Sequence, residues 1–123
     1  MFIKHVDWLD RETSEAKVLI SDGIIDILCF SHPFYGVTGD KLLDHIYCLD
    51  AKNIVVANSQ QFYMQREESL GYFGYSICGK LIDRKNQIVR LNNIALCLGD
   101  THIPNDISEG SYIEFEVTRL DIS

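Results

Sequence analysis

Long apolar stretches are missing from the sequence. Its longest uninterrupted apolar runs cover about five residues, whereas a membrane-spanning helix needs about 20. The opening residues, MFIKHVDWLDRETSEAK, are charged and contain no apolar centre of the kind found in signal peptides. These two absences predict a cytoplasmic protein that does not contact a membrane.

Closely spaced cysteine pairs are also missing. The four cysteines, Cys29, Cys48, Cys78 and Cys97, each lie in an apolar context and are separated by 19, 30 and 19 residues. Zinc sites usually take two ligands from one tight turn, which a CxxC pair supplies and this sequence does not. In a reducing cytoplasm such cysteines behave as small buried apolar side chains. We therefore expect four reduced thiols, mostly buried, and no bound metal.

The motifs of common enzymes are absent as well. The sequence contains no GxGxxG, GxxxxGK[ST], HExxH or GxSxG segment, so nucleotide-phosphate and common hydrolase chemistry lack their usual scaffold. We expect no catalytic residues and no cofactor. One enzymatic alternative stays open. His32 and His102 each lie just before a proline, and with Asp40 or Asp106 they would form a metal or acid–base site of a small enzyme.

Positive charge is scarce. The chain has 11 lysines and arginines against 18 aspartates and glutamates, which gives a net charge of −7. The imbalance is uneven, because residues 51–98 hold six basic and three acidic side chains, whereas residues 1–50 and 99–123 together hold five basic and 15 acidic ones. An acidic surface attracts cationic partners and repels phosphate. The charge therefore favours a basic protein partner and disfavours nucleic acid.

What the sequence does contain is a series of short segments rich in β-branched and aromatic residues. In KVLISDGIIDILCF two such segments flank Gly23, which supplies the positive φ of a tight turn, so 17–21 is predicted to pair with 24–30. A polar stretch at 83–87 similarly predicts that 76–83 pairs with 88–98. Turn signals about every ten residues are typical of a β-sandwich or small barrel.

The remaining segments give weaker patterns. With 123 residues the chain is close to the commonest size of one domain, and we expect a polar N-terminal arm at 1–13 followed by a single domain at 14–123. Residues 53–58 are predicted to form a short strand. The segment 61–71 suits either a strand or a helical turn. The segment 38–50 fits a helix by its apolar spacing, although its similarity to a later strand favours an extended form.

That similarity is a repeated frame. A proline, a glycine six residues later and a Leu-Asp pair ten residues after that occur twice, 71 residues apart: Pro33, Gly39, Leu49 and Asp50, then Pro104, Gly110, Leu120 and Asp121. Proline ends one strand and glycine makes the turn into the next. A shared structural need therefore accounts for the frame, and an ancient duplication stays open.

The order of these segments resembles the oligonucleotide/oligosaccharide-binding (OB) fold. An early hairpin, a connector, a long hairpin containing GKLID and a final strand introduced by EGSYIEF follow one another over residues 15–121. The turns at Thr38-Gly39-Asp40 and Glu109-Gly110-Ser111 resemble the entry into strands of such barrels. The resemblance implies a mainly β, single-domain, small Greek-key barrel or sandwich of five or more strands, and it implies no particular activity.

In size and charge the chain is similar to bacterial immunity proteins, which are small acidic cytoplasmic proteins that block a toxin by covering its active face. This likeness implies a non-enzymatic inhibitor whose partner is a basic protein such as a toxin; the oligomeric state stays open. The alternation in YIEFEVTRLD predicts that Glu114 and Glu116 share one face of a strand with the aromatic Tyr112. The expected partner-binding residues are Asp22, Asp26, Phe34, Tyr35, Asp40, Asp44, Glu109, Tyr112, Glu114 and Glu116.

The middle third of the chain supports an alternative function. Aromatic residues are concentrated at 62–75, among basic ones. Barrels of the OB kind bind single-stranded nucleic acid by stacking bases on aromatic rings and pairing phosphates with cations. In this alternative the binding residues are Arg66, Lys80, Arg84, Lys85 and Arg90.

Overall fold

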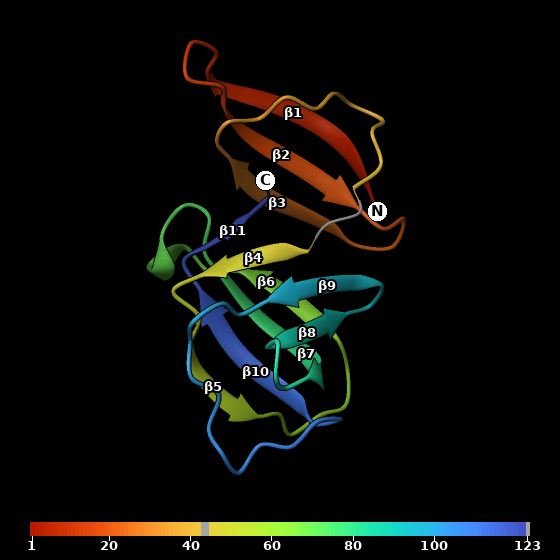
Figure 1. Cartoon of the computed structure of the whole chain (residues 1–123), viewed down its shortest axis with the longest axis vertical. Coiled ribbons are helices and arrows are strands. Elements are labelled where there is room, and N and C mark those ends of the chain that lie inside the picture. The colour runs from red at the N-terminus through yellow and green to blue at the C-terminus, as the bar shows by residue number, and fades with distance from the viewer. Residues whose placement is uncertain (43–44, 123) are drawn as a thin grey trace.

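The computed structural model describes residues 1–42 and 45–122. Within these ranges the secondary structure consists of eleven strands and one short 3-10 helix (Figure 1). Their bounds are β1 Phe2–Asp10, β2 Glu15–Ser21, β3 Asp26–Ser31, β4 Ile46–Leu49, β5 Lys52–Val56, β6 Tyr63–Arg66, the helix η1 Glu68–Leu70, β7 Tyr75–Asp83, β8 Ile88–Leu91, β9 Ile94–Cys97, β10 Tyr112–Val117 and β11 Arg119–Asp121.

All eleven strands belong to one mixed sheet. Neighbours follow the order β1-β2-β3-β11-β4-β9-β8-β7-β10-β5, and β6 pairs with β7 outside this path. Most pairs are antiparallel, while β11 with β3 and β4 with β9 run parallel. The mainly β, single-domain class is thus confirmed. In the described part of the chain the path ends at β1 and at β5, so the sheet is not closed and an OB barrel is not shown.

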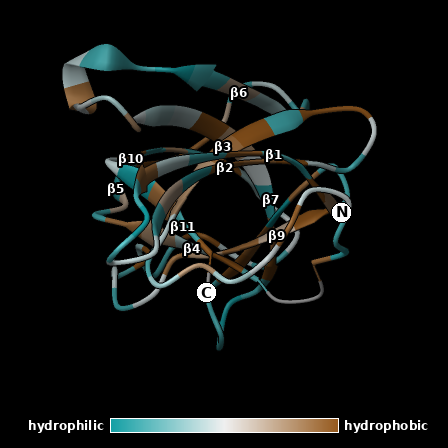
Figure 2. Cartoon of the chain, turned by 90° about the horizontal axis from the view of Figure 1, so that it is seen from above, coloured by the Kyte–Doolittle hydropathy of each residue, from teal (hydrophilic) through white to brown (hydrophobic). Residues whose placement is uncertain are grey.

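The sheet curls around one core. Strand β10 continues into β11 after a single residue, Thr118, although the two strands are well separated in the sheet order. One length of chain therefore runs beside both β7 and β4, and the strands wrap around a shared interior (Figure 2). Alternate side chains fill that interior, among them Ile20, Ile77 and Phe115. Each apolar side chain of this size contributes about 1.5–3 kcal/mol on burial.

The first predicted hairpin is confirmed. Strand β2 pairs with β3 in antiparallel register, with Val18 opposite Cys29. The turn between them is held by the Asp22 carboxylate, whose Oδ1 accepts the backbone N–H groups of Ile24 at 2.8 Å and Ile25 at 2.9 Å. Gly23 has a φ of 94°. Aspartate and glycine thus supply the turn chemistry that the sequence indicated.

The second predicted hairpin is confirmed in its first half and needs a correction in its second. Strand β7 pairs with β8, but the run 88–98 is not one strand. It turns at Asn92 and Asn93, and β9 returns along β8. Asn92 has a φ of 51°, and asparagine tolerates this left-handed conformation better than most residues. The Asn-Asn pair was therefore a turn signal that the apolar residues around it obscured.

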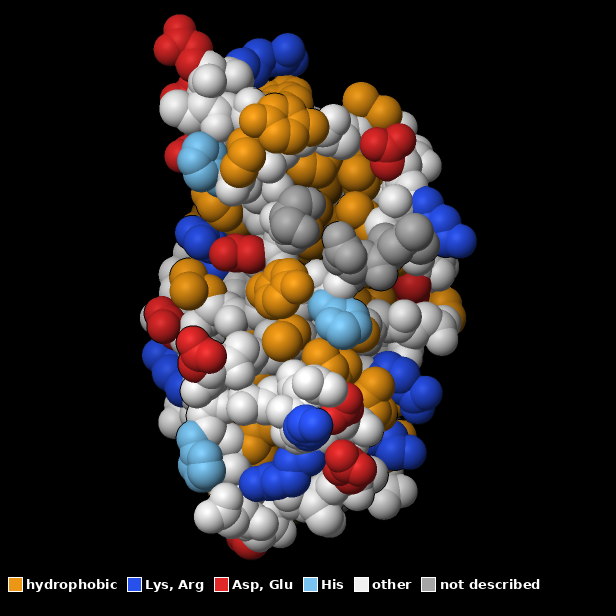
Figure 3. Space-filling view, in the orientation of Figure 1, with side chains coloured by type: hydrophobic (Ala, Val, Ile, Leu, Met, Phe, Trp, Pro, Cys, Tyr) orange, Lys and Arg blue, Asp and Glu red, His pale blue; other side chains and the backbone are white. Residues whose placement is uncertain are grey.

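The first 13 residues, expected as a polar arm, contain strand β1, which pairs with β2 along its whole length. Its Ile3 is buried and forms two backbone hydrogen bonds with the loop after β3, accepting from Gly39 and donating to Asp40, both at 2.8 Å. Trp8 packs against Phe34 with ring centroids 5.9 Å apart. Figure 3 shows apolar side chains over this upper part of the molecule, where β1 and the loop after β3 lie.

The connecting segments contain short strands. The segment 53–58 is strand β5, as predicted, with bounds shifted by one or two residues. The segment 61–71 holds both forms considered for it, strand β6 and then helix η1. The segment 38–50 ends in the extended strand β4. Its residues 43 and 44 lie outside the described residues.

The repeated frame corresponds to two similar turns. Gly39 and Gly110 have φ angles of 96° and 90°, in the region that favours glycine. Each turn precedes a strand, and the two Leu-Asp ends meet, because Leu120 lies opposite Cys48 in the pairing of β11 with β4. The shared structural need is therefore a glycine turn that leads into a paired strand.

The four cysteines are free thiols. Cys29 and Cys78 are buried, whereas Cys48 and Cys97 are half-buried. Burial raises the pKa of the Cys29 and Cys48 thiols above their ordinary value, with nearby Cys and Asp side chains adding smaller contributions. Among the residues described, no helix is long and apolar enough to cross a membrane.

Candidate functional site

Strand β10 presents a row of polar side chains away from the core. Its odd-numbered residues are buried, whereas Tyr112, Glu114 and Glu116 are half-buried on the opposite side of the strand. The predicted shared face of these three residues is confirmed. It results from the two-residue repeat of a strand, which points alternate side chains in opposite directions.

The row continues onto three further strands, β5, β7 and β6. Glu114 lies between Val55 of β5 and Cys78 of β7, and Tyr63 of β6 lies opposite Cys78 on the far side. We call this surface the β10 face. Its members are Asn53, Val55, Tyr63, Ser76, Cys78, Lys80, Tyr112, Glu114 and Glu116.

A groove of about 210 Å³ opens on the β10 face, lined by both glutamates and by residues of β5, β6 and β7. Val55 and Tyr63, on either side of it, are 52% and 42% exposed. Exposed apolar side chains next to carboxylates give a surface that can both attract a cation and bury an apolar contact.

No salt bridge neutralises the negative charge of this groove in the part of the chain that the structure describes. Among the described residues neither Glu114 nor Glu116 takes part in a salt bridge, and Glu116 accepts a hydrogen bond from the Asn53 amide. Burial, and after it the charge of Glu114, raises the pKa of the Tyr63 phenol and of the Cys78 thiol. Both neighbours therefore stay uncharged at neutral pH, and the charge of Glu114 remains available to a partner.

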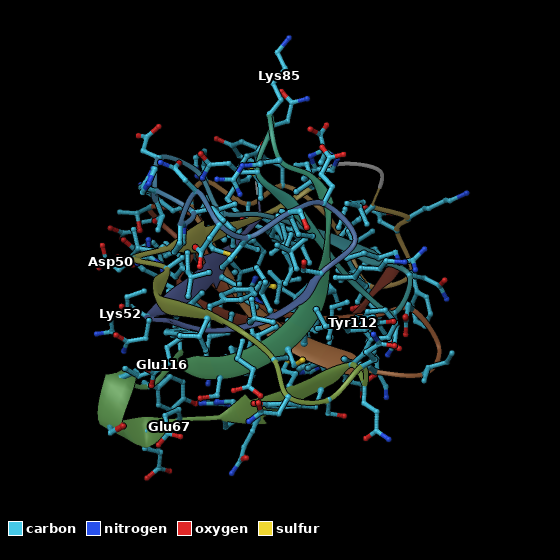
Figure 4. The ribbon with its side chains drawn as sticks, turned by 90° about the horizontal axis from the view of Figure 1, so that it is seen from below. Asp50, Lys52, Glu67, Lys85, Tyr112 and Glu116 are labelled. Carbon is cyan, nitrogen blue, oxygen red and sulfur yellow. The ribbon has the colours of Figure 1, made fainter. Side chains whose placement is uncertain are left out.

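Lys52 is the cation nearest in register to this pair of glutamates, since it lies opposite Glu116 on β5. Figure 4 shows both residues on the same side of the molecule, with Tyr112 toward the other end of β10. Lys52 is exposed, and an exposed pair contributes only about 0–1 kcal/mol even when formed. Glu114, which has no lysine opposite it on β5, is therefore a stronger candidate than Glu116 for binding a cationic side chain of a partner.

The other end of the β10 face is basic and aromatic. Lys80 lies opposite Tyr112 on one side and Arg90 of β8 on the other. Phe62 packs against Tyr112 with centroids 5.3 Å apart, and the Arg90 guanidinium lies 5.8 Å from the Phe62 ring centre. The face thus joins an acidic groove to a small cationic and aromatic patch.

Two of the expected acidic residues are engaged in the first hairpin. The Asp22 carboxylate holds its own turn, as described above. Asp26 forms a salt bridge with Lys4 at 2.7 Å, and this hydrogen bond is the first cause of its lowered pKa. Neither residue belongs to the β10 face.

The remaining expected acidic residues are also bound locally or are not described. Asp40 accepts the backbone N–H of Val37 at 2.9 Å, and Glu109 accepts that of Arg84 at 2.9 Å. Glu109 lines a second groove that includes Tyr112, so it lies beside one end of the β10 face. Asp44 lies outside the described residues.

The two loop aromatics expected in a binding site differ in exposure. Phe34 is only 3% exposed and packs into the core against Trp8, whereas Tyr35 is 83% exposed. Tyr35 remains a candidate contact residue. Phe34 serves the core, because its neighbour β1 supplies the apolar surface that covers it.

The basic residues of the nucleic-acid alternative do not form one patch. Arg84 donates to the backbone carbonyls of Ile103, Pro104 and Ile107 and so holds a loop in place. Lys85 is exposed at the tip of the β7–β8 turn and projects away from the rest of the molecule (Figure 4).

Arg66 packs near two tyrosines. Its guanidinium lies 5.3 Å from the Tyr72 ring centre and 5.5 Å from that of Tyr75. Only Lys80 and Arg90 of the proposed set are strand neighbours.

The histidines of the enzymatic alternative are exposed loop residues. His32 forms a cis peptide bond with Pro33, and His102 lies in the loop after β9. Across residues 1–42 and 45–122, no group of three or more His, Cys, Asp or Glu side chains could hold a metal ion.

Sequence reasoning missed Asn53, Val55 and Tyr63 as members of the β10 face. The pattern NIVVAN identified a strand but did not indicate which side of it is exposed. Tyr63 was considered only among aromatics near basic residues. The pairing that brings β5 and β6 beside β10 and β7 is non-local, and a single sequence contains no local signal for it.

The fold and face define the class of this molecule: a mainly β, single-domain protein with an open eleven-stranded mixed sheet among its described residues and an acidic groove on one face. In comparison with known proteins, the chain matches no family model, no curated protein and no solved structure.

Proposed function

We propose that this protein is a non-enzymatic binding protein whose β10 face engages a basic protein partner. The observation that carries the proposal is the position of Glu114, half-buried at a groove between Val55 and Tyr63 with no salt bridge among the described residues. A lysine or arginine of a partner would supply the missing countercharge.

The affinity for the partner and the rate of association would have different sources. A net charge of −7 speeds the approach of a cationic protein. Tyr63 and Val55, and Tyr112 at the far end, offer apolar area whose burial supplies affinity. Small size and acidity favour an inhibitor of the immunity type as the form that this function takes.

The test measures association with a basic model protein, cytochrome c, by stopped-flow mixing at low and moderate salt. Glu114→Lys/Glu116→Lys is expected to slow association about tenfold or more at low salt and to reduce its salt dependence. The matched control is Glu12→Lys/Glu68→Lys, which makes the same change in net charge at two exposed residues outside the face. Equal slowing in both variants would leave only a general charge effect and would contradict a specific face.

A second candidate function rests on the basic end of the face. Arg90, Phe62 and Tyr112 lie next to one another beside Lys80, and cations interleaved with aromatic rings are the combination that holds a nucleotide of a single strand. Gel retardation of a labelled single strand at two salt concentrations tests it, with Lys80→Gln/Arg90→Gln expected to abolish the shift. Retardation that is insensitive to salt or to this variant would exclude phosphate binding there.

A further inference from the structure

A further groove, distinct from the two described above, lies on the other side of β6. Because side chains alternate along this strand, Met64 and Arg66 point away from the β10 face that Tyr63 joins. They face the hairpin formed by β2 and β3, and together with it they line a groove of about 330 Å³. Its seven lining residues are Leu19, Ile25, Asp26, Leu28, Met64, Arg66 and Tyr75.

Most of this groove is apolar. Leu19, Ile25, Leu28 and Met64 are all half-buried, so each keeps part of its surface open to the groove. A water molecule takes up about 30 Å³ in the liquid, so a volume of this size holds about ten non-hydrogen atoms. An aliphatic chain of several carbons fits these walls and this volume.

One end of the groove carries hydrogen-bond donors. The Tyr75 side chain is only 4% exposed, and its hydroxyl oxygen accepts the backbone N–H of Leu28 at 2.9 Å. Within the described residues this hydroxyl donates no hydrogen bond, so its proton is available to a ligand. Burial raises the pKa of Tyr75, with the Leu28 bond and the charge of Arg66 opposing the shift, so the proton is retained at neutral pH.

Arg66 supplies the cation at the same end. Its guanidinium lies 5.5 Å from the centre of the Tyr75 ring and donates to the Tyr72 carbonyl. Guanidinium has five N–H donors. The Tyr72 carbonyl accepts from one of its terminal nitrogens, so other N–H groups remain for a ligand. The guanidinium lies near the rings of both Tyr72 and Tyr75, and a guanidinium can recognise a carboxylate through two parallel N–H groups.

The carboxylate in the groove wall does not cancel this cation. Asp26 is already paired with Lys4 at 2.7 Å. The charge that remains for a ligand is therefore that of Arg66, beside an uncharged phenol.

From these contacts we propose that the groove between the β2–β3 hairpin and the β6–β7 strands binds a small aliphatic monocarboxylate. Its carboxylate accepts hydrogen bonds from Arg66 and from the Tyr75 hydroxyl, and its chain lies on Leu19, Leu28 and Met64. This site is separate from the β10 face and does not depend on the protein function proposed above.

Octanoate is the probe, titrated into the full chain labelled with ¹⁵N and with ¹³C at the methionine methyl groups. Saturable shifts are expected at the Leu28 amide, which bonds the Tyr75 hydroxyl at the head-group end, and at the Met64 methyl, which lies on the apolar wall. Octan-1-ol and octylamine test the head group, and each is expected to bind about tenfold or more weakly, since neither can accept two ionic hydrogen bonds.

Arg66→Gln is expected to weaken octanoate binding about tenfold or more, because it removes an ionic hydrogen bond. Arg90→Gln makes the same charge change on the β10 face and is expected to leave the affinity unchanged. The proposal is overturned if octanoate gives no saturable shift at these two groups, if octan-1-ol binds as well, or if both arginine variants behave alike. The ligand comparison uses the unaltered chain and so decides the matter even if Arg66→Gln does not fold.

Discussion

Tyr75 and Leu28 are joined across the molecule by a hydrogen bond of 2.9 Å, from the backbone N–H of β3 to the phenol oxygen of β7. The two strands are not neighbours in the sheet order. A buried side chain therefore satisfies a backbone group that no sheet partner serves. It fixes the distance between the first hairpin and the strands that form the β10 face.

Tyr75→Phe is expected to reduce the free energy of unfolding by about 1–3 kcal/mol, because it leaves the Leu28 N–H without a partner in a partly buried place. Urea unfolding followed by circular dichroism gives this number. Tyr72→Phe removes a hydroxyl that, among the described residues, accepts only from Lys17 in a solvent-exposed hydrogen bond, and its effect is expected to stay within about 0.5 kcal/mol. Equal losses would show that the Tyr75 bond has no special role.

Gly79→Ala is expected to destabilise the protein by about 1–3 kcal/mol through overpacking. A Cβ atom at this position of β7 would lie 2.6 Å from a methyl carbon of Val89 and 2.8 Å from the Arg90 carbonyl oxygen. Thermal unfolding measures the change, and Ser76→Ala on the same strand is the control. A stable Gly79→Ala variant would mean that β7 and β8 separate more easily than their register suggests.

The Asp22 turn predicts a pH dependence. Burial acts to raise the pKa of Asp22, but the N–H groups of Ile25, Ile24 and Asn93 outweigh it and the pKa lies below its ordinary 3.8. Ionised Asp22 therefore adds stability above pH 3.8, and this stability is lost as the pH falls further and the folded carboxylate protonates.

Asp22→Ala is accordingly expected to cost about 1 kcal/mol at pH 7, with allowance for solvent screening, and progressively less below pH 3.8. Unfolding curves at pH 7, 4 and 2.5 measure the difference. Asp100→Ala, at an exposed loop position, is expected to show no such trend. A difference that grew on acidification would contradict the sign of the shift.

The thiols are expected to react in two groups with a disulfide reagent at pH 8. Cys29 and Cys78 have no exposed surface, and the half-buried Cys48 has a raised pKa, so these three should react only on unfolding, since the thiolate is the reactive form. Cys97 should react first. Cys97→Ser would then remove the fast phase, and its persistence in that variant would point to opening of the core.

The hairpins were predictable because their signals are local. Asp22-Gly23 fixes one turn, and the alternating residues around it show which side is buried. Strand β1 was missed as a strand because its exposed side chains are polar and its pairing depends on β2. The open path of the sheet was beyond sequence reasoning as well, since residues far apart in the chain, such as Asp121 and Phe30, decide it.

The candidate site was predictable to the extent that it lies on one strand. Glu114, Glu116 and Tyr112 follow from the alternation of β10. The acidic residues of turns were predicted in the same site from their charge alone. In the structure Asp26 forms a salt bridge with Lys4, and Asp40 accepts a backbone hydrogen bond from Val37. Charge in a sequence does not reveal which carboxylates the fold has already used.

Strand β11 determines when the molecule can be completed during synthesis. It lies between β3 and β4, yet among the described strands it comes after all the others in the chain. A ribosome adds about 5–20 residues per second. Several seconds therefore pass between the synthesis of β3 and that of its second neighbour, β11. During that time the nascent chain carries an unmated strand edge. We expect β3 to gain its second sheet neighbour only after residues 119–121 have left the ribosome.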